Sequence, residues 1–376
     1  MTGMTDIGTI DKAELFIVKL PLVSPFVTSY GSVSHRESLL LKLTSGKLSG
    51  WGECAAFRDP DYYHETIDTS LHIAAGYLIP RLLKASGITP STMSGLFTGI
   101  RGHHMPKAMI ENAVFDLAAR MAGVPLFKLL GGRGKRIRSG ISLGIPPDID
   151  TLLDQIRSAV KKKYHRVKVK IKKGWDLNIV SAIRSDFPYL NLVVDANGDY
   201  TVDDIPVMQM LDKFDLKMIE QPLAAGDLLG HSKVQEKIDT PLGLDESING
   251  IHDAANAVFL KSGRIICIKQ GRVGGLSKSL ELMDFCLKND LKVCCGGMLE
   301  TGIGRAFNIH LQSVDGFELP GDISETSRYF EEDIVMEPVV LDQDGYINLP
   351  GGNGSGTQVD EEKVERFMVF RKILKR

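Results

Sequence analysis

From Arg136 to Phe330, short apolar runs alternate with amphipathic stretches of helical period, and this alternation constrains the fold more than any other feature. Seven helix-like stretches separate eight strand-like runs: IRSGISLGI, RVKVKI, LNLVVD, LKMIEQ, PLGLDE, IICIKQ, LKVCCGG and GFELPG. Strands that alternate with helices pair in parallel, and at this count a closed barrel is the commonest arrangement. The sequence therefore predicts an α/β barrel over residues 136–330.

The segments on either side of the barrel have a different pattern. Residues 1–135 begin with strand-like runs, ELFIVKLPL and ESLLLKLTSGKLSGWGE, around a turn-rich stretch, PFVTSYGSVSH, and continue with helices such as MPKAMIENAVFDLAARMAG. We expect an α+β domain with an antiparallel sheet there. Residues 331–376 hold short strand candidates, a glycine-rich turn and a terminal helix. They are too few for a separate core, so we expect them to pack back on the first domain.

Composition excludes several classes of protein. The chain has 376 residues with 45 basic and 47 acidic side chains, so no strong overall field attracts nucleic acid or an anionic membrane. Five cysteines without a C-x-x-C pair indicate neither a disulfide framework nor a zinc site. The chain has no run of about 18 apolar residues and no secretory pattern at its start. We therefore expect a cytoplasmic protein without nucleic-acid or membrane partners.

Charged residues stand at the ends of successive predicted strands. The intervals from Lys170 to Asp195, Glu220, Asp245 and Lys269 are 25, 25, 25 and 24 residues, which is one strand and one helix each time. Barrel enzymes place their chemistry at the carboxyl ends of the strands. Neighbouring strand ends would bring these side chains together at one end of the barrel.

Three converging carboxylates repel one another unless a cation lies between them. Asp195, Glu220 and Asp245 are hard oxygen donors without histidine or cysteine, which favours Mg²⁺, with Mn²⁺ as an alternative. Each acid alone is equally explained as a cap on the helix that follows it. The common register of all three favours the metal site.

The lysines at 168, 170 and 269 are candidate acids and bases. Lys168 and Lys170 lie two apart on one strand and so face the same side, where mutual repulsion would lower the pKa of one of them. A basic edge strand is the alternative, because further lysines surround this pair. Lys269 favours the catalytic interpretation, because the second and sixth strands of an eight-stranded barrel lie on opposite sides. Two bases on opposite faces of a metal-bound carboxylate permit racemisation, and one base permits a syn elimination.

At these residues the sequence resembles the muconate lactonizing subgroup of the enolase superfamily. The resemblance is carried by KVK (168–170), DANGDY (195–200), EQP (220–222), DES (245–247) and IKQGRVGGLS (268–277), and it spans essentially the whole chain. It implies an α+β capping domain over a modified TIM barrel, (β/α)₇β, with Lys170 and Lys269 as the acid/base pair. It also implies that Lys168 assists the substrate carboxylate, and that Asn197 and Glu246 support the metal and lysines.

Within this subgroup the likeness is strongest to o-succinylbenzoate synthases that are also N-succinylamino acid racemases, and it rests on SPFVTSYG, GWGECAAFRDPDYY, SGISLGI, GGMLETGIGRAFN and PGDISETSRYF. It implies a metal-dependent lyase of menaquinone biosynthesis, a racemase of N-acylamino acids, or both, acting on a small carboxylate as a homo-oligomer. The residues expected to bind substrate are Ser142, Phe26, Tyr30, Tyr62, Arg272, Gly297, Met298 and Ile323.

Other functions stay open at this point. A muconate-type cycloisomerase or a dipeptide epimerase would use the same lysines and acids, although GDIS lacks the Asp-x-Asp pair typical of the epimerases. Lys269 would form a Schiff base in a lysine-dependent aldolase, which has no need of three converging acids. A non-catalytic binding protein is the third class, and we would expect it to have lost one of the five charged positions.

Overall fold

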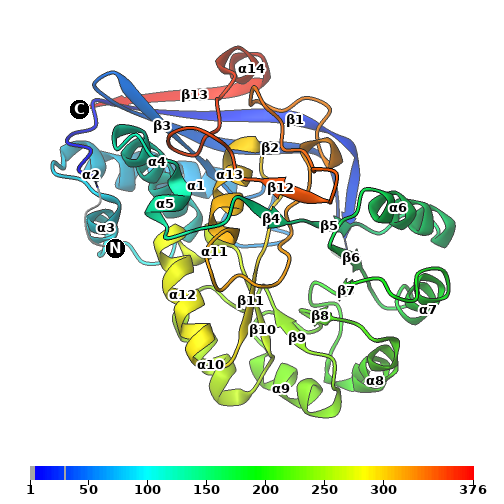
Figure 1. The fold of residues 1–376 in the computed structure, drawn as a ribbon. Coiled ribbons are helices and arrows are strands. Elements are labelled where there is room, and N and C mark those ends of the chain that lie inside the picture. The colour runs from blue at the N-terminus through cyan, green and yellow to red at the C-terminus, as the bar shows by residue number, and fades with distance from the viewer. Residues whose placement is uncertain (1–4, 29–30) are drawn as a thin grey trace.

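The computed structural model describes residues 5–28 and 31–376, so Tyr30 lies outside the described residues. Seven of the eight predicted runs form strands of one parallel sheet that follows chain order (Figure 1). This confirms the predicted α/β barrel as the centre of the fold. The strands are β5 (Gly140–Leu143), β6 (Arg166–Lys170), β7 (Leu192–Asp195), β8 (Met218–Glu220), β9 (Leu242–Leu244), β10 (Ile265–Ile268) and β11 (Lys292–Cys295).

The eighth run, GFELPG, does not form a strand, and this part of the prediction was wrong. Gly316 has a positive φ of 117°, and Pro320 lacks an N–H that a strand ladder needs. The segment that follows still closes the ring. Asp322 N donates to Cys295 O of β11 at 2.8 Å, and Gly140 N of β5 donates to Ile323 O at 3.1 Å.

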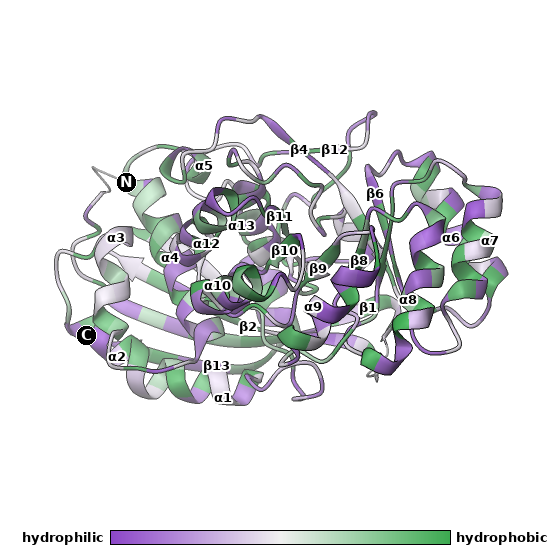
Figure 2. Ribbon diagram, turned by 90° about the horizontal axis from the view of Figure 1, so that it is seen from below, coloured by the Kyte–Doolittle hydropathy of each residue, from purple (hydrophilic) through white to green (hydrophobic). Residues whose placement is uncertain are grey.

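Helices cover the outer face of the barrel. Helices α6 and α7 show alternating apolar and polar stripes, as helices with one face against a sheet do (Figure 2). Val167, Val169 and Ile171 pack in the core beneath them, while Lys168 and Lys170 face the interior, as the alternation predicts. The barrel helices are α6 (Ile149–Lys161), α7 (Leu177–Asp186), α8 (Ile205–Leu211), α9 (Leu228–Lys237), α10 (Ile251–Leu260), α11 (Gln270–Val273), α12 (Leu276–Lys288) and α13 (Gly302–Gln312).

The N-terminal part forms a four-stranded antiparallel sheet beside the barrel, in the order β13-β1-β2-β3 (Figure 1). The stretch expected to be a turn is instead part of two long paired strands, β1 (Lys12–Thr28) and β2 (Gly31–Ser45). The other elements here are β3 (Leu48–Cys54), α1 (Ile67–Ile73), the π-helix η1 (Ala74–Leu78), α2 (Ile79–Lys84), α3 (Pro90–Met93), the 3₁₀ helix η2 (Ser94–Phe97), α4 (His104–Met121) and α5 (Leu126–Leu129).

Two glycines let α4 lie directly against β3. A Cβ atom at Gly52 would stand 2.0 Å from Met109 O, and one at Gly50 would stand 2.3 Å from Ala113 O. Only glycine leaves room for the helix backbone at these two positions. The Gly-Trp-Gly motif therefore fixes the distance between the capping sheet and its main helix.

The last part of the chain returns to the first. β12 (Tyr346–Asn348) pairs with β4 (Arg136–Arg138), and after α14 (Glu361–Phe367) the chain ends in β13 (Met368–Lys375), which pairs with β1. The predicted terminal helix is therefore followed by a strand, because the edge of β1 offers a partner that the sequence alone does not reveal. The domain limits at 135/136 and 330/331 stay a prediction. Among the described helices, none is both long and apolar enough to cross a lipid bilayer.

Candidate active site

The strand register brings the predicted charged residues together at one end of the barrel. Lys170 of β6 is paired with Asp195 of β7, and Asp195 with Glu220 of β8. Asp245 directly follows β9, and all of these side chains are buried. The prediction that regular spacing gathers these residues at one place agrees with this register.

Two lysines from β6 bind the carboxylates on one side of the site. Lys168 Nζ lies 3.1 Å from Asp195 Oδ2, 2.8 Å from Glu220 Oε1 and 2.6 Å from Asp322 Oδ2. Lys170 Nζ donates to Asp195 Oδ2 at 2.6 Å and to Asn197 Oδ1 at 2.6 Å. Asn197 in turn donates to Glu246 Oε1 at 2.8 Å, so both predicted supporting residues belong to this network.

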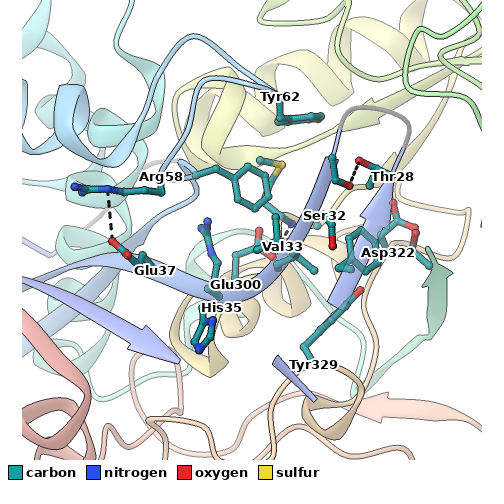
Figure 3. A pocket seen from close by; sticks show the side chains of 18 of the residues that line it. Thr28, Ser32, Val33, His35, Glu37, Arg58, Tyr62, Glu300, Asp322 and Tyr329 are labelled. Carbon is teal, nitrogen blue, oxygen red and sulfur yellow. Dashed lines mark hydrogen bonds and ion pairs between the residues drawn. The ribbon is translucent and has the colours of Figure 1, made fainter. Parts of the chain in front are cut away.

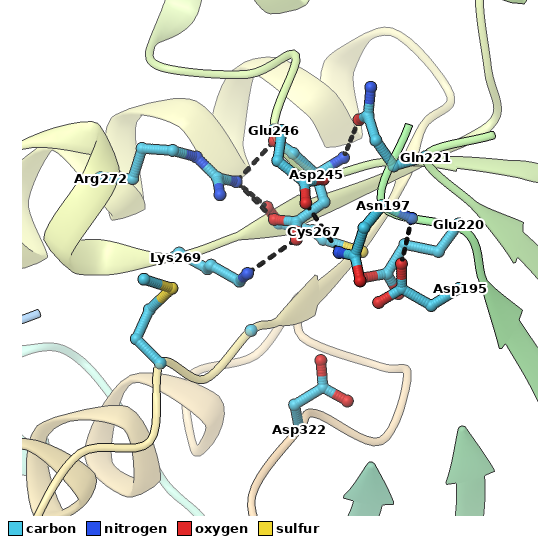
Figure 4. A network of polar contacts seen from close by, with 12 residues as sticks. Asp195, Asn197, Glu220, Gln221, Asp245, Glu246, Cys267, Lys269, Arg272 and Asp322 are labelled. Atoms are coloured by element: carbon cyan, nitrogen blue, oxygen red, sulfur yellow. Dashed lines mark hydrogen bonds and ion pairs between the residues drawn. The ribbon is translucent and has the colours of Figure 1, made fainter. Parts of the chain in front are cut away.

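Lys269 binds the third acid from the opposite side. Its Nζ donates to Asp245 Oδ2 at 2.7 Å and to the hydroxyl of Tyr62 at 2.6 Å. Arg272 Nη2 donates to the other oxygen of Asp245 at 2.5 Å, so the two cations meet at one carboxylate (Figure 4). Asp245 is therefore held from both sides, and Lys269 is fixed by a capping-domain tyrosine.

The charges of this cluster shift several pKa values. Burial opposes the charged form of Lys168, but Asp322, Glu220 and Asp195 outweigh it and hold the lysine pKa well above its usual range. Lys168 is therefore not the lysine whose pKa is lowered, because the charges of these carboxylates outweigh both burial and the repulsion from Arg166. Burial and the neighbouring charge of Asp195 raise the pKa of Glu220.

The donor set fits a hard divalent cation. Asp195, Glu220 and Asp245 supply only carboxylate oxygens, and Glu220 Oε2 is a buried acceptor without a partner in the described part of the chain. In this structure, lysine ammonium groups bind these carboxylates. Within residues 5–28 and 31–376, no group of three or more Asp, Glu, His or Cys side chains is arranged to hold a metal ion. An orphaned buried carboxylate oxygen beside two further acids is what a metal site without its ion would leave.

A cavity of about 350 Å³ opens above these residues, between the barrel and the capping domain. Figure 3 shows Ser32 and Val33 of the capping hairpin, which is formed by β1 and β2. They face Tyr62 across the cavity, and Asp322 lies beside the cavity. The three predicted catalytic lysines line this cavity, together with Asn197. So do six of the predicted substrate-binding residues: Phe26, Tyr62, Ser142, Gly297, Met298 and Ile323.

Arg272 does not line the cavity. The side chain is fully buried, and its Nη1 donates to the hydroxyl of Tyr62 at 3.1 Å while its Nε donates to Ile248 O. Its hydrogen bonds go to Asp245, Tyr62 and backbone carbonyl groups, so contact with substrate is not what this geometry supports. Arg272 instead orients Asp245 and Tyr62.

Asp322 is the main functional candidate that the sequence interpretation missed. It lines the cavity, binds Lys168, and forms an ion pair with Arg166. Burial opposes its ionisation, but Arg166 and Lys168 outweigh burial and lower its pKa. The acid at the second position of GDIS was the available signal, although the strand pattern that would have placed it in the barrel is weak there.

Comparison with known proteins agrees with the fold. Residues 12–131 match the N-terminal domain of mandelate racemase and muconate lactonizing enzyme, and residues 151–363 match the enolase C-terminal domain-like family. An o-succinylbenzoate synthase from Geobacillus kaustophilus is 43% identical over 360 residues, 96% of each chain. An N-succinylamino acid racemase from Thermus thermophilus is 39% identical over 365 residues, 97% of this chain and 99% of the relative. A crystal structure of an enolase-superfamily member from Listeria innocua has a TM-score of 0.94 at 36% identity and covers 98% of this chain and 99% of its own.

The barrel, the capping domain and the acids at successive strand ends define an enzyme of the enolase superfamily. The chain belongs to the mandelate racemase and muconate lactonizing enzyme family within it. This confirms the resemblance seen in the sequence. Enzymes of this superfamily act on small molecules and in general depend on Mg²⁺.

Proposed function

We propose that this protein removes the proton α to the carboxylate of a small organic acid, as an o-succinylbenzoate synthase, an N-succinylamino acid racemase, or both. The names of relatives at 39% to 43% identity over nearly the whole chain support the substrate class. A role in menaquinone biosynthesis follows for the synthase activity. Homo-oligomeric assembly and a cytoplasmic location stay predictions.

One observation carries the proposal: Lys170 and Lys269 line the same cavity from strands four places apart in the barrel. Each ammonium group is bound to a different carboxylate, Asp195 or Asp245. A substrate placed between the lysines would present one face to each of them. Proton removal and proton return can therefore take place on opposite faces of one carbon.

We assign the metal to Asp195, Glu220 and Asp245. When bound, Mg²⁺ supplies the positive charge that stabilises the ene-diolate form of a substrate carboxylate. Lys168 lies beside two of the predicted ligands, Asp195 and Glu220, and adds a further positive charge for the substrate carboxylate. Tyr62 and Arg272 hold Lys269 and Asp245 in place through the contacts described above.

In the racemase reaction one lysine takes the α-proton and the other returns a proton to the opposite face. In the synthase reaction a single lysine takes the α-proton and then protonates the departing hydroxyl group on the same face. The lysine across the cavity then acts only as a positive charge. The same side chains therefore serve both reactions, and the substrate supplied decides which one occurs.

The alternatives have less support. A dipeptide epimerase would need a second acid where Ser324 follows Ile323, and a serine does not bind a peptide ammonium group by charge. A Schiff-base mechanism at Lys269 makes no use of the three buried acids Asp195, Glu220 and Asp245. A muconate-type cycloisomerase keeps the same lysines, and a substrate panel separates it from the proposed reactions.

The proposal is tested with Lys170→Ala and Lys269→Ala. We expect each variant to lose racemisation of N-succinylamino acids while it still exchanges the α-proton of one enantiomer with deuterium from solvent. The two variants should retain exchange with opposite enantiomers, because each variant keeps the base on one face of the substrate. Wild-type racemisation rates in either variant would contradict the two-base assignment. Activity that survives complete chelation of divalent ions would contradict the metal assignment.

A further inference from the structure

Arg36 is a buried cation on the capping hairpin that the proposed chemistry does not use. It lies on β2, lines the same cavity as the two lysines, and is only 1% exposed. Its guanidinium lies 4.6 Å from the centre of the Phe57 ring, and Nη2 donates to Ala55 O at 3.3 Å. The chain thus places a second positive centre in the cavity, on the capping side.

Two nitrogen atoms of this guanidinium, Nε and Nη1, have no hydrogen-bond partner among the residues that the structure describes. The two acids whose charges act most strongly on Arg36, Glu53 and Glu300, are already engaged elsewhere. Glu53 accepts hydrogen bonds from Thr301 N, Thr301 Oγ1 and Gly304 N at the start of α13. Glu300 accepts from Met298 N at 2.8 Å and from Asn308 Nδ2 at 3.0 Å.

A buried arginine with unused donors is costly unless an anion completes it. Burial accordingly lowers the pKa of Arg36, and the more distant charges of Glu53 and Glu300 do not restore it. A guanidinium offers two parallel N–H groups, which match the two oxygens of a carboxylate. The missing partner therefore has the chemistry of a carboxylate that arrives with a ligand.

We propose that Arg36 recognises the distal carboxylate of a succinyl-bearing substrate, at the end of the molecule away from the two lysines. This rests on the proposed function and names the residue that would distinguish a dicarboxylate from a monocarboxylate. Nε and Nη1 are shielded in this structure, and the proposal requires the Phe57 ring beside the guanidinium to turn aside when the ligand binds. Ser324 Oγ, which is also buried and without a partner among the described residues, belongs to the same cavity wall and can donate a hydrogen bond to the acyl group.

The test compares two substrates that differ only at the distal end: an N-succinylamino acid and its N-succinamoyl analogue, in which a neutral amide replaces the distal carboxylate. We expect the wild-type enzyme to racemise the succinyl compound with a kcat/KM about 10- to 100-fold higher, as the loss of a charged hydrogen bond implies. In Arg36→Met this preference should fall to within about threefold, with kcat/KM for the analogue nearly unchanged. Arg36→Lys keeps the charge without the paired N–H groups and should lie between the two.

Arg81→Met is the matched control, because Arg81 lies exposed on α2 and is absent from the cavity wall. It should keep the full preference. Equal loss of both substrates in Arg36→Met would mean that Arg36 only supports the structure, and would overturn the proposal. A wild-type enzyme without preference would overturn it even where the variant does not fold. A wild-type enzyme that racemises the analogue alone leaves the proposed function standing and removes Arg36 from it, whereas no turnover of any N-acylamino acid or of the synthase substrate overturns both.

Discussion

Glu111 gives the sharpest quantitative prediction, because a buried carboxyl group here joins the capping domain to the barrel. It lies on α4 and is only 2% exposed. Its Oε2 accepts a hydrogen bond from Ser277 N at 3.2 Å, in the first turn of α12. A cap from α4 therefore replaces the side-chain cap that α12 lacks at Gly275.

Burial raises the pKa of Glu111 from 4.5 to about 7, although hydrogen bonds from Ser277 and Leu276 oppose the shift. In the unfolded chain the group ionises near pH 4.5, whereas in the folded protein it stays protonated until about pH 7. Stability is therefore lost as the pH rises through this window and stays low above it. The two pKa values correspond to roughly 3 kcal/mol of unfolding free energy.

Glu111→Gln removes the titration and keeps an acceptor for Ser277 N. Below about pH 4.5 the variant and the wild type should have the same stability, and above pH 7 the variant should be more stable by roughly 3 kcal/mol. For a chain of this length that corresponds to a Tm about 4 °C higher. Thermal unfolding of both proteins from pH 4.5 to 8 measures the difference. Glu281→Gln, an exposed carboxylate on the same α12, is the control and should show almost no change.

A Tm difference that does not vary with pH would refute this argument, because only a titration that differs between folded and unfolded chains produces the slope. A variant that becomes less stable than the wild type as the pH rises would refute the sign of the predicted pKa shift. Either result would mean that the cap on α12, and not burial, controls the ionisation of Glu111.

Three further predictions follow from single contacts. Gly52→Ala should lower Tm by about 4 °C or more, because the new Cβ would meet Met109 O; Gly226→Ala, with open space around it, should not. Tyr62→Phe should lower the racemase kcat about tenfold without a change in Tm, because Lys269 loses its hydroxyl partner; an unchanged kcat would contradict this role. Asp195→Asn should weaken Mn²⁺ binding about tenfold or more by calorimetry, and equal affinity would exclude this acid as a ligand.

Much of this protein follows from periodicity. A strand and a helix recur about every 25 residues, and a parallel sheet puts the carboxyl ends of its strands at one edge, so Lys170, Asp195 and Glu220 had to be neighbours once the strands paired. Alternation along β6 likewise places Lys168 and Lys170 on the inner face. These features depend only on local geometry repeated along the chain.

Features that depend on partners far apart in the chain could not be predicted from periodicity. GFELPG resembles a strand, yet the ring closes through the irregular residues after it. The last eight residues before Arg376 form a strand because the edge of β1 is free to pair with them. Asp322 reaches Lys168 only because the barrel closes.

The sequence by itself determined the barrel, the set of acids and the two lysines proposed as acid and base, because a repeat of fixed length converts spacing into position. Only the tertiary structure decided the charge balance among them, the burial of Arg272 behind Asp245 and the unpartnered guanidinium of Arg36. Burial and pairing depend on every neighbour in three dimensions, and those neighbours come from parts of the chain that no local pattern connects.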